Sequence, residues 1–199
     1  KINKNTKKFF DLKKILFGAI STHQEEEIFC AKIHADLKKK YKNGITIIIP
    51  RHIHRSSNIK EEIENIGLKV HLHSSGEKID SKTDIYLVDT FGETKLFIKI
   101  CNIVFLGGSL IHHGGQNPIE AARLGCKVIH GPNIDNFSEV YNLLYKNNIS
   151  SKIKTTKQAK SIIQKNLKNT FSSKKIIKKL NSIGNKVLSS NEKEISKYI

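Results

Sequence analysis

The chain has 199 residues and a formal net charge of +17, and 38% of its residues are hydrophobic. This length and apolar content suit one ordinary globular domain with a core of its own. Three cysteines, Cys30, Cys101 and Cys126, are too few and too widely spaced for a disulfide framework or a zinc site built on C-x-x-C pairs. We therefore expect them to be reduced core residues.

The positive charge indicates an anionic partner or an anionic surface. Nucleic acid is one candidate, but thirteen of the lysines lie in residues 151–199, Trp is absent and aromatic residues are few. Aromatic platforms that would stack on bases are therefore missing. We expect no nucleic-acid partner, and the Lys-rich C-terminal segment instead suits an anionic membrane surface.

Apolar, β-branched runs of strand length alternate with helical segments along the chain. The predicted strands are, in chain order, 15–20, 45–49, 68–72, 84–88, 103–106 and 127–130. The predicted helices are about 24–40, 56–66, a short one through 98, one from 118 to 125, and 137–147. This alternation predicts an α/β fold, a Rossmann-like parallel sheet with helices on both faces.

Residues 1–150 are expected to form this Rossmann-like domain, and residues 151–199 a Lys-rich helical extension packed on it. The chain contains no Met and begins in a polar segment unlike a signal peptide, so we expect it to be a piece of a longer protein.

The segment from Gly107 to Asn117 is a glycine-rich loop between a buried strand and a helix. Two glycine pairs allow close approach of the backbone to a ligand, Ser109 and Asn117 add side-chain donors, and the amides at the helix start face anions. The loop therefore predicts a phosphate site. Glu120, one turn into the helix, can accept hydrogen bonds from two ribose hydroxyls. The alternative is a structural turn followed by a surface glutamate.

Arginine is rare in this chain, with only Arg51, Arg55 and Arg123 among its 35 basic residues. Two of the three lie in one loop, Pro50–Arg55, after the second strand. In a sequence that otherwise uses lysine, an arginine indicates a position that needs a planar, bidentate group for phosphate or carboxylate. Capping of the next helix is the alternative for this loop, and we expect Arg123 to be structural.

Two further loops follow strands and should meet at the same edge of the sheet, where open α/β sheets bind ligands. Ser21–His23 follows the first strand, and Asp89–Glu93 follows the fourth. Phe91 is expected either near a nucleotide base or in the core. The glutamates that begin the next helix, Glu25, Glu26 and Glu27, either compensate the helix dipole or contact a ligand.

These four loops together resemble the C-terminal domain of the bacterial 3-deoxy-D-manno-octulosonic acid (Kdo) transferases, which have the GT-B fold. That family shows S-T-H-x-G-E-E, P-R-H-x-x-R, D-T-x-G-E-L and G-G-S-L-x-x-x-G-G-x-N-x-x-E on equivalent loops. Here the segments read STHQEEE, PRHIHR, DTFGET and GGSLIHHGGQNPIEAA, in the same order over residues 21–137. The chain departs from the pattern at Glu25, where the family has glycine, and at Thr94, where it has leucine.

The resemblance implies the donor-binding half of an inverting glycosyltransferase, which transfers Kdo from CMP-Kdo to a lipid A precursor at the cytoplasmic face of the inner membrane. It implies no metal or other cofactor. The general base and acceptor surface would belong to an N-terminal domain that is missing here, so no catalytic residue is assigned and the chain alone is expected to be inactive. The implied donor-binding residues are Ser21, Thr22, His23, Arg51, His52, Thr90, Phe91, Gly92, Glu93, Gly107, Gly108, Ser109, Gly114, Gly115, Asn117 and Glu120.

Other functions share parts of this pattern. Another GT-B glycosyltransferase or a sugar-nucleotide epimerase would also have the glycine loop and the ribose glutamate. A non-catalytic basic module that binds nucleotides or membranes is the third alternative. The S-T-H and P-R-H-x-x-R segments favour the Kdo transferases over the first two.

Overall fold

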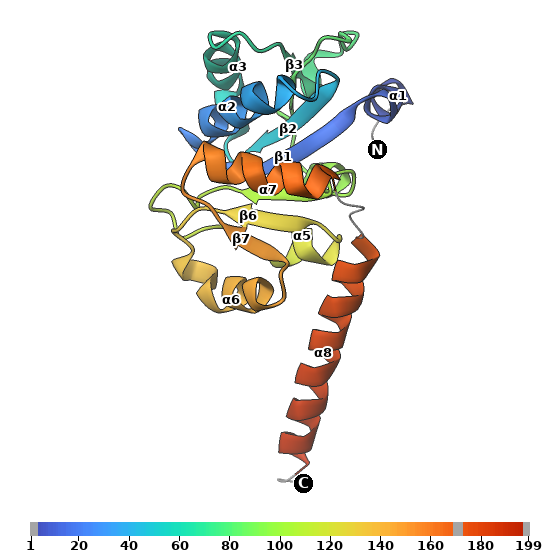
Figure 1. The fold of residues 1–199 in the computed structure, drawn as a ribbon, viewed down its shortest axis with the longest axis vertical. Coiled ribbons are helices and arrows are strands. Elements are labelled where there is room, and N and C mark those ends of the chain that lie inside the picture. The colour runs from blue at the N-terminus through green and yellow to red at the C-terminus, as the bar shows by residue number, and fades with distance from the viewer. Residues whose placement is uncertain (1–3, 169–172, 197–199) are drawn as a thin grey trace.

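Figure 1 shows the computed structural model of the chain, which describes residues 4–168 and 173–196. The strands are β1 (Lys14–Thr22), β2 (Gly44–Pro50), β3 (Val70–Leu72), β4 (Ile85–Leu87), β5 (Ile103–Leu106), β6 (Lys127–His130) and β7 (Ser150–Lys152). The α-helices are α1 (Lys4–Leu12), α2 (Glu26–Lys38), α3 (Ser56–Glu64), α4 (Thr94–Ile98), α5 (Ile119–Arg123), α6 (Ser138–Lys146), α7 (Thr156–Lys168) and α8 (Ser173–Ile195). Short 3-10 turns are η1 (Ile53–Arg55), η2 (His73–Ser75) and η3 (Asp135–Phe137).

The strands of the described residues form one seven-stranded parallel sheet in the order β3-β4-β2-β1-β5-β6-β7. The chain starts at β1 in the middle of the sheet, builds β2, β3 and β4 on one side, and then returns to place β5 on the other. The order therefore reverses between β1 and β5. In open α/β sheets the crevice at such a reversal is where ligands bind.

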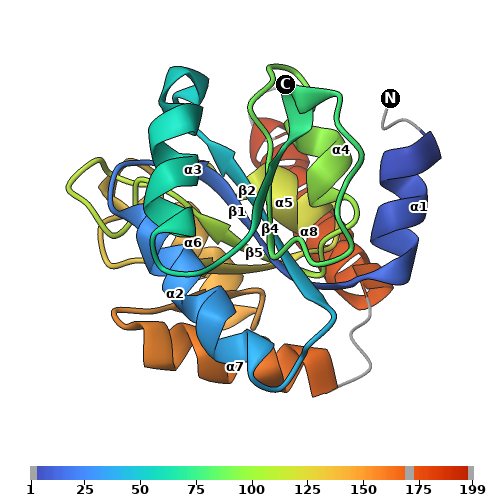
Figure 2. The ribbon, with the colours of Figure 1, turned by 90° about the horizontal axis from the view of Figure 1, so that it is seen from above.

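Helices cover both faces of the sheet (Figure 2). Helices α2, α3 and α7 pack in one apolar cluster with the strands, and α1, α4, α5 and α6 contribute to a second cluster on the other face. Strand β2 shows why both layers form. Its Ile45, Ile47 and Ile49 join one cluster while Ile48 joins the other, as the two-residue period of a strand requires. The predicted Rossmann-like fold is confirmed.

Two elements were not expected from the sequence. Helix α1 lies in the polar N-terminal segment and has two buried residues, Thr6 and Phe10; the Phe10 ring meets that of Tyr86 edge to face at 5.0 Å between centroids. Strand β7 has the polar sequence Ser-Ser-Lys, which carries no strand signal, and its pairing is given by backbone bonds to β6. The expected boundary at residue 150 falls within this strand.

Helices α7 and α8 follow β7 and behave differently. Helix α7 packs on α2, where Ala159 and Ile163 enter the core. Helix α8 contacts α5 near its start, where Ile176 is buried, and then extends away from the domain (Figure 1). None of the helices in the described ranges combines the length and the apolar character that crossing a lipid bilayer requires.

Candidate functional site

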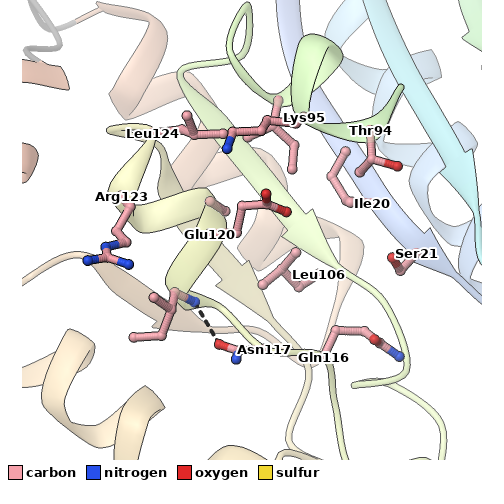
Figure 3. Close-up of a pocket in the computed structure, with 13 residues that line it drawn as sticks. Ile20, Ser21, Thr94, Lys95, Leu106, Gln116, Asn117, Glu120, Arg123 and Leu124 are labelled. Carbon is pink, nitrogen blue, oxygen red and sulfur yellow. Dashed lines mark hydrogen bonds between the residues drawn. The ribbon is translucent and has the colours of Figure 1, made fainter. Parts of the chain in front are cut away.

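A cavity of about 500 Å³ opens at the point where the strand order reverses (Figure 3). It is bounded by the ends of β1 and β5 and by helices α4 and α5. Glu120 projects into the space between these two helices, whereas Arg123 points to the other side of α5. The residues that line the cavity are Ile20, Ser21, Thr94, Lys95, Ile98, Leu106, Gln116, Asn117, Ile119, Glu120, Ala121, Arg123 and Leu124.

Ser21 reaches this cavity because β1 is irregular at its end. The pairing with β2 shifts register between Ile20 and Thr22, and the intervening Ser21 has φ 53°. Bulges of this kind re-aim a side chain at the end of a strand. The neighbouring Gly107 lies so close that a Cβ there would be 2.1 Å from the Ser21 carbonyl oxygen. Only glycine fits, so the ends of β1 and β5 are in direct backbone contact.

The carboxylate of Glu26 is buried beneath the glycine-rich loop. Its Oε2 accepts the backbone N–H of Gly108 at 2.7 Å and of His23 at 3.0 Å. Its Oε1 accepts those of Ser109 at 3.0 Å and Leu110 at 2.9 Å. The side chain of Glu26 therefore ties the loop after β1 to the loop after β5.

The first half of the glycine-rich loop thus faces protein. Ser109 is fully buried, and its hydroxyl donates to the Leu106 carbonyl at 2.6 Å and accepts the Gly131 N–H at 2.8 Å. In the second half, Gly115 donates its N–H to the Gly108 carbonyl at 2.8 Å, and Gly114 accepts the N–H of Asn136 at 3.1 Å. The part of the segment that borders the cavity is Gln116–Glu120.

The adjacent Glu27 holds the second ligand-loop candidate, Pro50–Arg55. Glu27 is buried and accepts a hydrogen bond from Arg55 Nη1 at 3.1 Å. Burial raises the pKa of Glu27, and the Arg55 guanidinium opposes that shift. The same loop is fixed at its start by the Arg51 N–H, which donates to the Thr22 carbonyl at 2.9 Å. Arg51 itself is exposed beside the cavity and does not line it.

Three imidazole rings, one from each of the loops after β1, β2 and β5, lie close together. The ring of His23 lies 4.3 Å from that of His113 and 5.6 Å from that of His52, centroid to centroid. Burial, together with the nearby His113 and His52, lowers the pKa of His23 to about 4. His23 is therefore neutral near pH 7. Within residues 4–168 and 173–196, no group of three or more His, Cys, Asp or Glu residues could hold a metal ion.

The side chain of His73 connects the loop after β4 to strand β4. The carboxylate of Glu93 accepts the Thr90 hydroxyl at 2.6 Å and lies 2.9 Å from His73 Nε2, while His73 Nδ1 lies 2.6 Å from the Tyr86 hydroxyl. An ionised carboxylate can only accept, so Nε2 carries the proton and Nδ1 accepts from Tyr86. Phe91, at the tip of this loop, is 77% exposed and so is not a core residue.

Of the residues predicted from sequence, Ser21, Asn117 and Glu120 line the cavity, and His23, Arg51 and His52 lie on adjoining loops. Glu93 is engaged in holding its own loop, and Ser109 in holding the glycine-rich loop. Lys95 lines the cavity but was missed, whereas Arg123 borders the cavity with its guanidinium turned to the other side of α5. Lys95 had no signal among so many lysines.

Comparison with known proteins gives a consistent set of relatives. The chain is 29% identical over 181 residues to the 3-deoxy-D-manno-octulosonic acid transferase of Haemophilus influenzae, covering 91% of this chain and 42% of that protein. It is 37% identical over 124 residues to a probable mitochondrial 3-deoxy-D-manno-octulosonic acid transferase of Arabidopsis thaliana, covering 61% of this chain and 28% of that protein. The chain thus spans less than half the length of these relatives. No protein-family model matches it.

Among solved structures, the C-terminal CMP-Kdo binding domain of WaaA from Acinetobacter baumannii has the same fold. The TM-score is 0.79 at 24% sequence identity, covering 88% of this chain and 91% of that domain. The C-terminal domain of a group 1 glycosyl transferase, LpcC from Francisella tularensis, gives a TM-score of 0.56 at 12% identity, covering 92% of this chain and 93% of that one.

Proposed function

The chain is a homologue of the Kdo transferases, and from this premise we propose that it is the donor-binding half of such an enzyme. The complete enzyme would transfer Kdo from CMP-Kdo to a lipid A precursor, with inversion at the anomeric carbon, during lipopolysaccharide inner-core synthesis. The remaining part of the enzyme would supply the general base and the acceptor surface. This chain would bind the donor and carry out no transfer alone.

One observation carries the proposal: the cavity of about 500 Å³ lies at the reversal point between β1 and β5. Its volume is within the range of small-molecule sites, roughly 300–1,000 Å³. Glu120 offers a carboxylate to the two ribose hydroxyls, and Asn117 an amide to a phosphate oxygen. The exposed Phe91 is placed on the neighbouring loop, where a ring face is available to the base.

The geometry also refines the role of each loop. The backbone amides of Gly108 and Ser109 already bind Glu26, so we assign them to shaping the crevice. The cations left to meet the donor phosphate are Arg51 and Lys95. As the acceptor hydroxyl attacks, the bond from the anomeric carbon to the phosphate oxygen breaks and CMP leaves with the electron pair. Fixed cations and amide donors at the cavity stabilise that leaving charge, which removes the need for a metal.

Calorimetric titration with CMP, and with UMP as the matched control, tests the proposal. CMP should bind, and UMP should bind at least about tenfold more weakly, since the site must read the base edge. Glu120→Gln should weaken CMP binding about tenfold by weakening the acceptor of the ribose hydroxyls. Glu139→Gln, an exposed change in the first turn of α6, should have no effect.

Arg51 needs a variant of its own because it lies beside the cavity. Arg51→Ala should weaken binding of CMP more than binding of cytidine, which lacks the phosphate. Arg51→Lys should recover part of the loss. Equal binding of CMP and UMP, or no binding of either, would favour another GT-B enzyme or a non-catalytic module.

We further propose that the Lys-rich helices lie against the anionic cytoplasmic surface of the inner membrane. Exposed lysines such as Lys174 and Lys178 lie on α8, which extends from the domain. Each lysine near such a surface contributes about 1 kcal/mol. Changing both to Gln should reduce binding to vesicles that contain anionic lipid. The same change at Lys42 and Lys82, which are exposed elsewhere, should reduce it less. Equal losses from both pairs would contradict this part of the proposal.

A further inference from the structure

Three successive peptide N–H groups, those of Gly108, Ser109 and Leu110, converge on one carboxylate, that of Glu26. Gly108 has φ +66°, and consecutive amides around such a left-handed residue form a concavity that binds anions. In many proteins a phosphate or sulfate fills such a nest. Here the chain fills it with its own side chain, which is 1% exposed.

The same carboxylate also accepts the N–H of His23 at 3.0 Å, so it bridges two segments more than 80 residues apart in sequence. These segments belong to the loops that follow β1 and β5, and nearby residues, Ser21 at the end of β1 and Gln116 in the loop after β5, line the cavity. The backbone bond from Gly107 N–H to the Ile20 carbonyl, at 2.9 Å, joins the same two segments one step deeper in the sheet. Four bonds to Glu26 therefore fix the loop after β1 against the loop after β5.

We propose that Glu26 is a positioning residue of the donor site, an internal anion that holds the glycine-rich loop in its binding shape. We call the four N–H bonds to Glu26 the clamp. The importance of the loop shape for binding CMP rests on the function proposed above, whereas the clamp itself does not. A buried carboxylate without partners costs several kcal/mol. The loop conformation in which the amides bind Glu26 is therefore strongly favoured over conformations in which they do not.

The clamp also fixes where the donor phosphate lies. Since the amides of residues 108–110 are occupied, the phosphate is directed to the outer side of the loop. There Ser21, Gln116 and Asn117 border the cavity. Glu26 touches neither the donor nor the reacting atoms, and acts only through the loop.

Glu26→Gln separates this role from simple packing, because glutamine has the same shape. A glutamine offers one oxygen to four N–H groups and turns its own N–H₂ toward two of them. We expect the amides of Ser109 and Leu110 to exchange hydrogen at least about tenfold faster, and CMP to bind at least about tenfold more weakly. Glu26→Asp keeps the charge on a shorter side chain, so its exchange rates and CMP affinity should lie between those of wild type and Glu26→Gln. Glu62→Gln, an exposed change on α3, is the matched control.

The outcomes are distinct. Wild-type exchange rates and CMP affinity in Glu26→Gln would overturn the clamp, because packing alone is preserved there. If wild type does not bind CMP at all, the donor-site proposal fails, while faster exchange in the variant still supports the clamp. If Glu26→Gln does not fold, hydrogen exchange of the wild-type protein tests the clamp. Its Ser109 and Leu110 amides should be protected like those of β5, and protection no better than that of the exposed Gly92 amide would overturn the proposal.

Discussion

Two buried carboxylates, Glu26 and Asp84, lie at opposite edges of the same sheet and are stabilised in different ways. Glu26, at the carboxyl edge, accepts only peptide N–H groups, and all of them come from loops. Asp84 precedes β4 at the amino edge. It accepts Lys38 Nζ at 2.8 Å and the Lys69 N–H at 2.9 Å, and lies 3.5 Å from His34 Nε2. The first carboxylate joins two loops at the carboxyl edge, and the second fastens helix α2 to the sheet.

The partners explain the difference. Burial lowers the pKa of His34 in spite of Asp84, so a neutral imidazole meets the carboxylate. Its other nitrogen, Nδ1, lies 2.9 Å from the Thr46 hydroxyl at the start of β2. His34 of α2 therefore links Asp84 to the Thr46 side chain of β2, and the connection contributes to global stability. The amides around Glu26 come instead from two loops at the carboxyl edge, and their bonds join those loops to each other.

The largest expected effect comes from removing the Asp84 carboxylate at the amino edge of the sheet. Asp84→Asn should lower the free energy of unfolding by about 2–3 kcal/mol, a value reduced because Lys38 is partly exposed and can turn to water. CMP affinity of the folded variant should stay at the wild-type value, which is the opposite of the pattern expected for Glu26→Gln. Urea denaturation and calorimetry measure the two quantities.

Asp36→Asn is the control for that change. It removes two partly exposed ion pairs, one with Lys39 just after α2 and one with Lys160 on α7, and such pairs contribute about 0–1 kcal/mol each. An equal loss of stability in the two variants would mean that the buried position of Asp84 has no special importance.

The same comparison predicts a pH dependence. Burial would raise the pKa of Asp84, but hydrogen bonds from His34 and Lys38 outweigh it and lower the pKa from 3.8 to about 2. The stability that this carboxylate contributes is fully present above pH 4, and is lost as the pH falls toward 2. A shift of this size corresponds to about 2 kcal/mol. Denaturant titrations between pH 5 and pH 2 should show this loss in wild type and a smaller slope in Asp84→Asn.

A smaller effect is expected at His73. Here a loop at the carboxyl edge is held by hydrogen bonds between side chains, and not by peptide N–H groups. His73→Phe removes both bonds that connect Tyr86 to Glu93 while filling similar space. The loop from Asp89 to Glu93 should loosen, so CMP affinity should fall about threefold to tenfold, and stability by about 1 kcal/mol. His54→Phe, at an exposed ring on η1, is the control. Unchanged affinity in His73→Phe would show that the loop takes no part in nucleotide binding.

Sequence patterns predicted the sheet well because its central strands are long apolar runs, such as Ile45–Ile49, bounded by Gly44 and Pro50. They could not predict β7, since the sequence Ser-Ser-Lys becomes a strand only through its pairing with β6. Likewise α1 depends on a distant aromatic contact of Phe10.

The site was predicted at the level of loops rather than contacts. Ser21, Asn117 and Glu120 were expected near one ligand because strand ends share an edge, and all three border the same cavity. Whether an amide in that loop faces a ligand or a carboxylate depends on where Glu26 projects, and a residue 82 positions away gives no sign of this in the sequence. The two interpretations left open for Glu26 and Glu27, dipole compensation or ligand contact, both omitted the bonds that they make to neighbouring loops.

The smallest expected effect concerns the residue just before Glu26. Glu25 has φ 74°, a left-handed conformation in which a side chain costs about 1–2 kcal/mol, and the S-T-H-x-G-E-E pattern that this loop resembles has glycine there. Glu25→Gly should therefore raise the free energy of unfolding by about 1 kcal/mol, after the entropy that glycine adds to the unfolded chain is subtracted. Asn148→Gly is the matched control at φ 57°, and should gain less because asparagine tolerates this region. Thermal denaturation of both variants measures the difference. A loss of stability in Glu25→Gly would mean that the Glu25 side chain makes a stabilising contribution that outweighs its backbone strain.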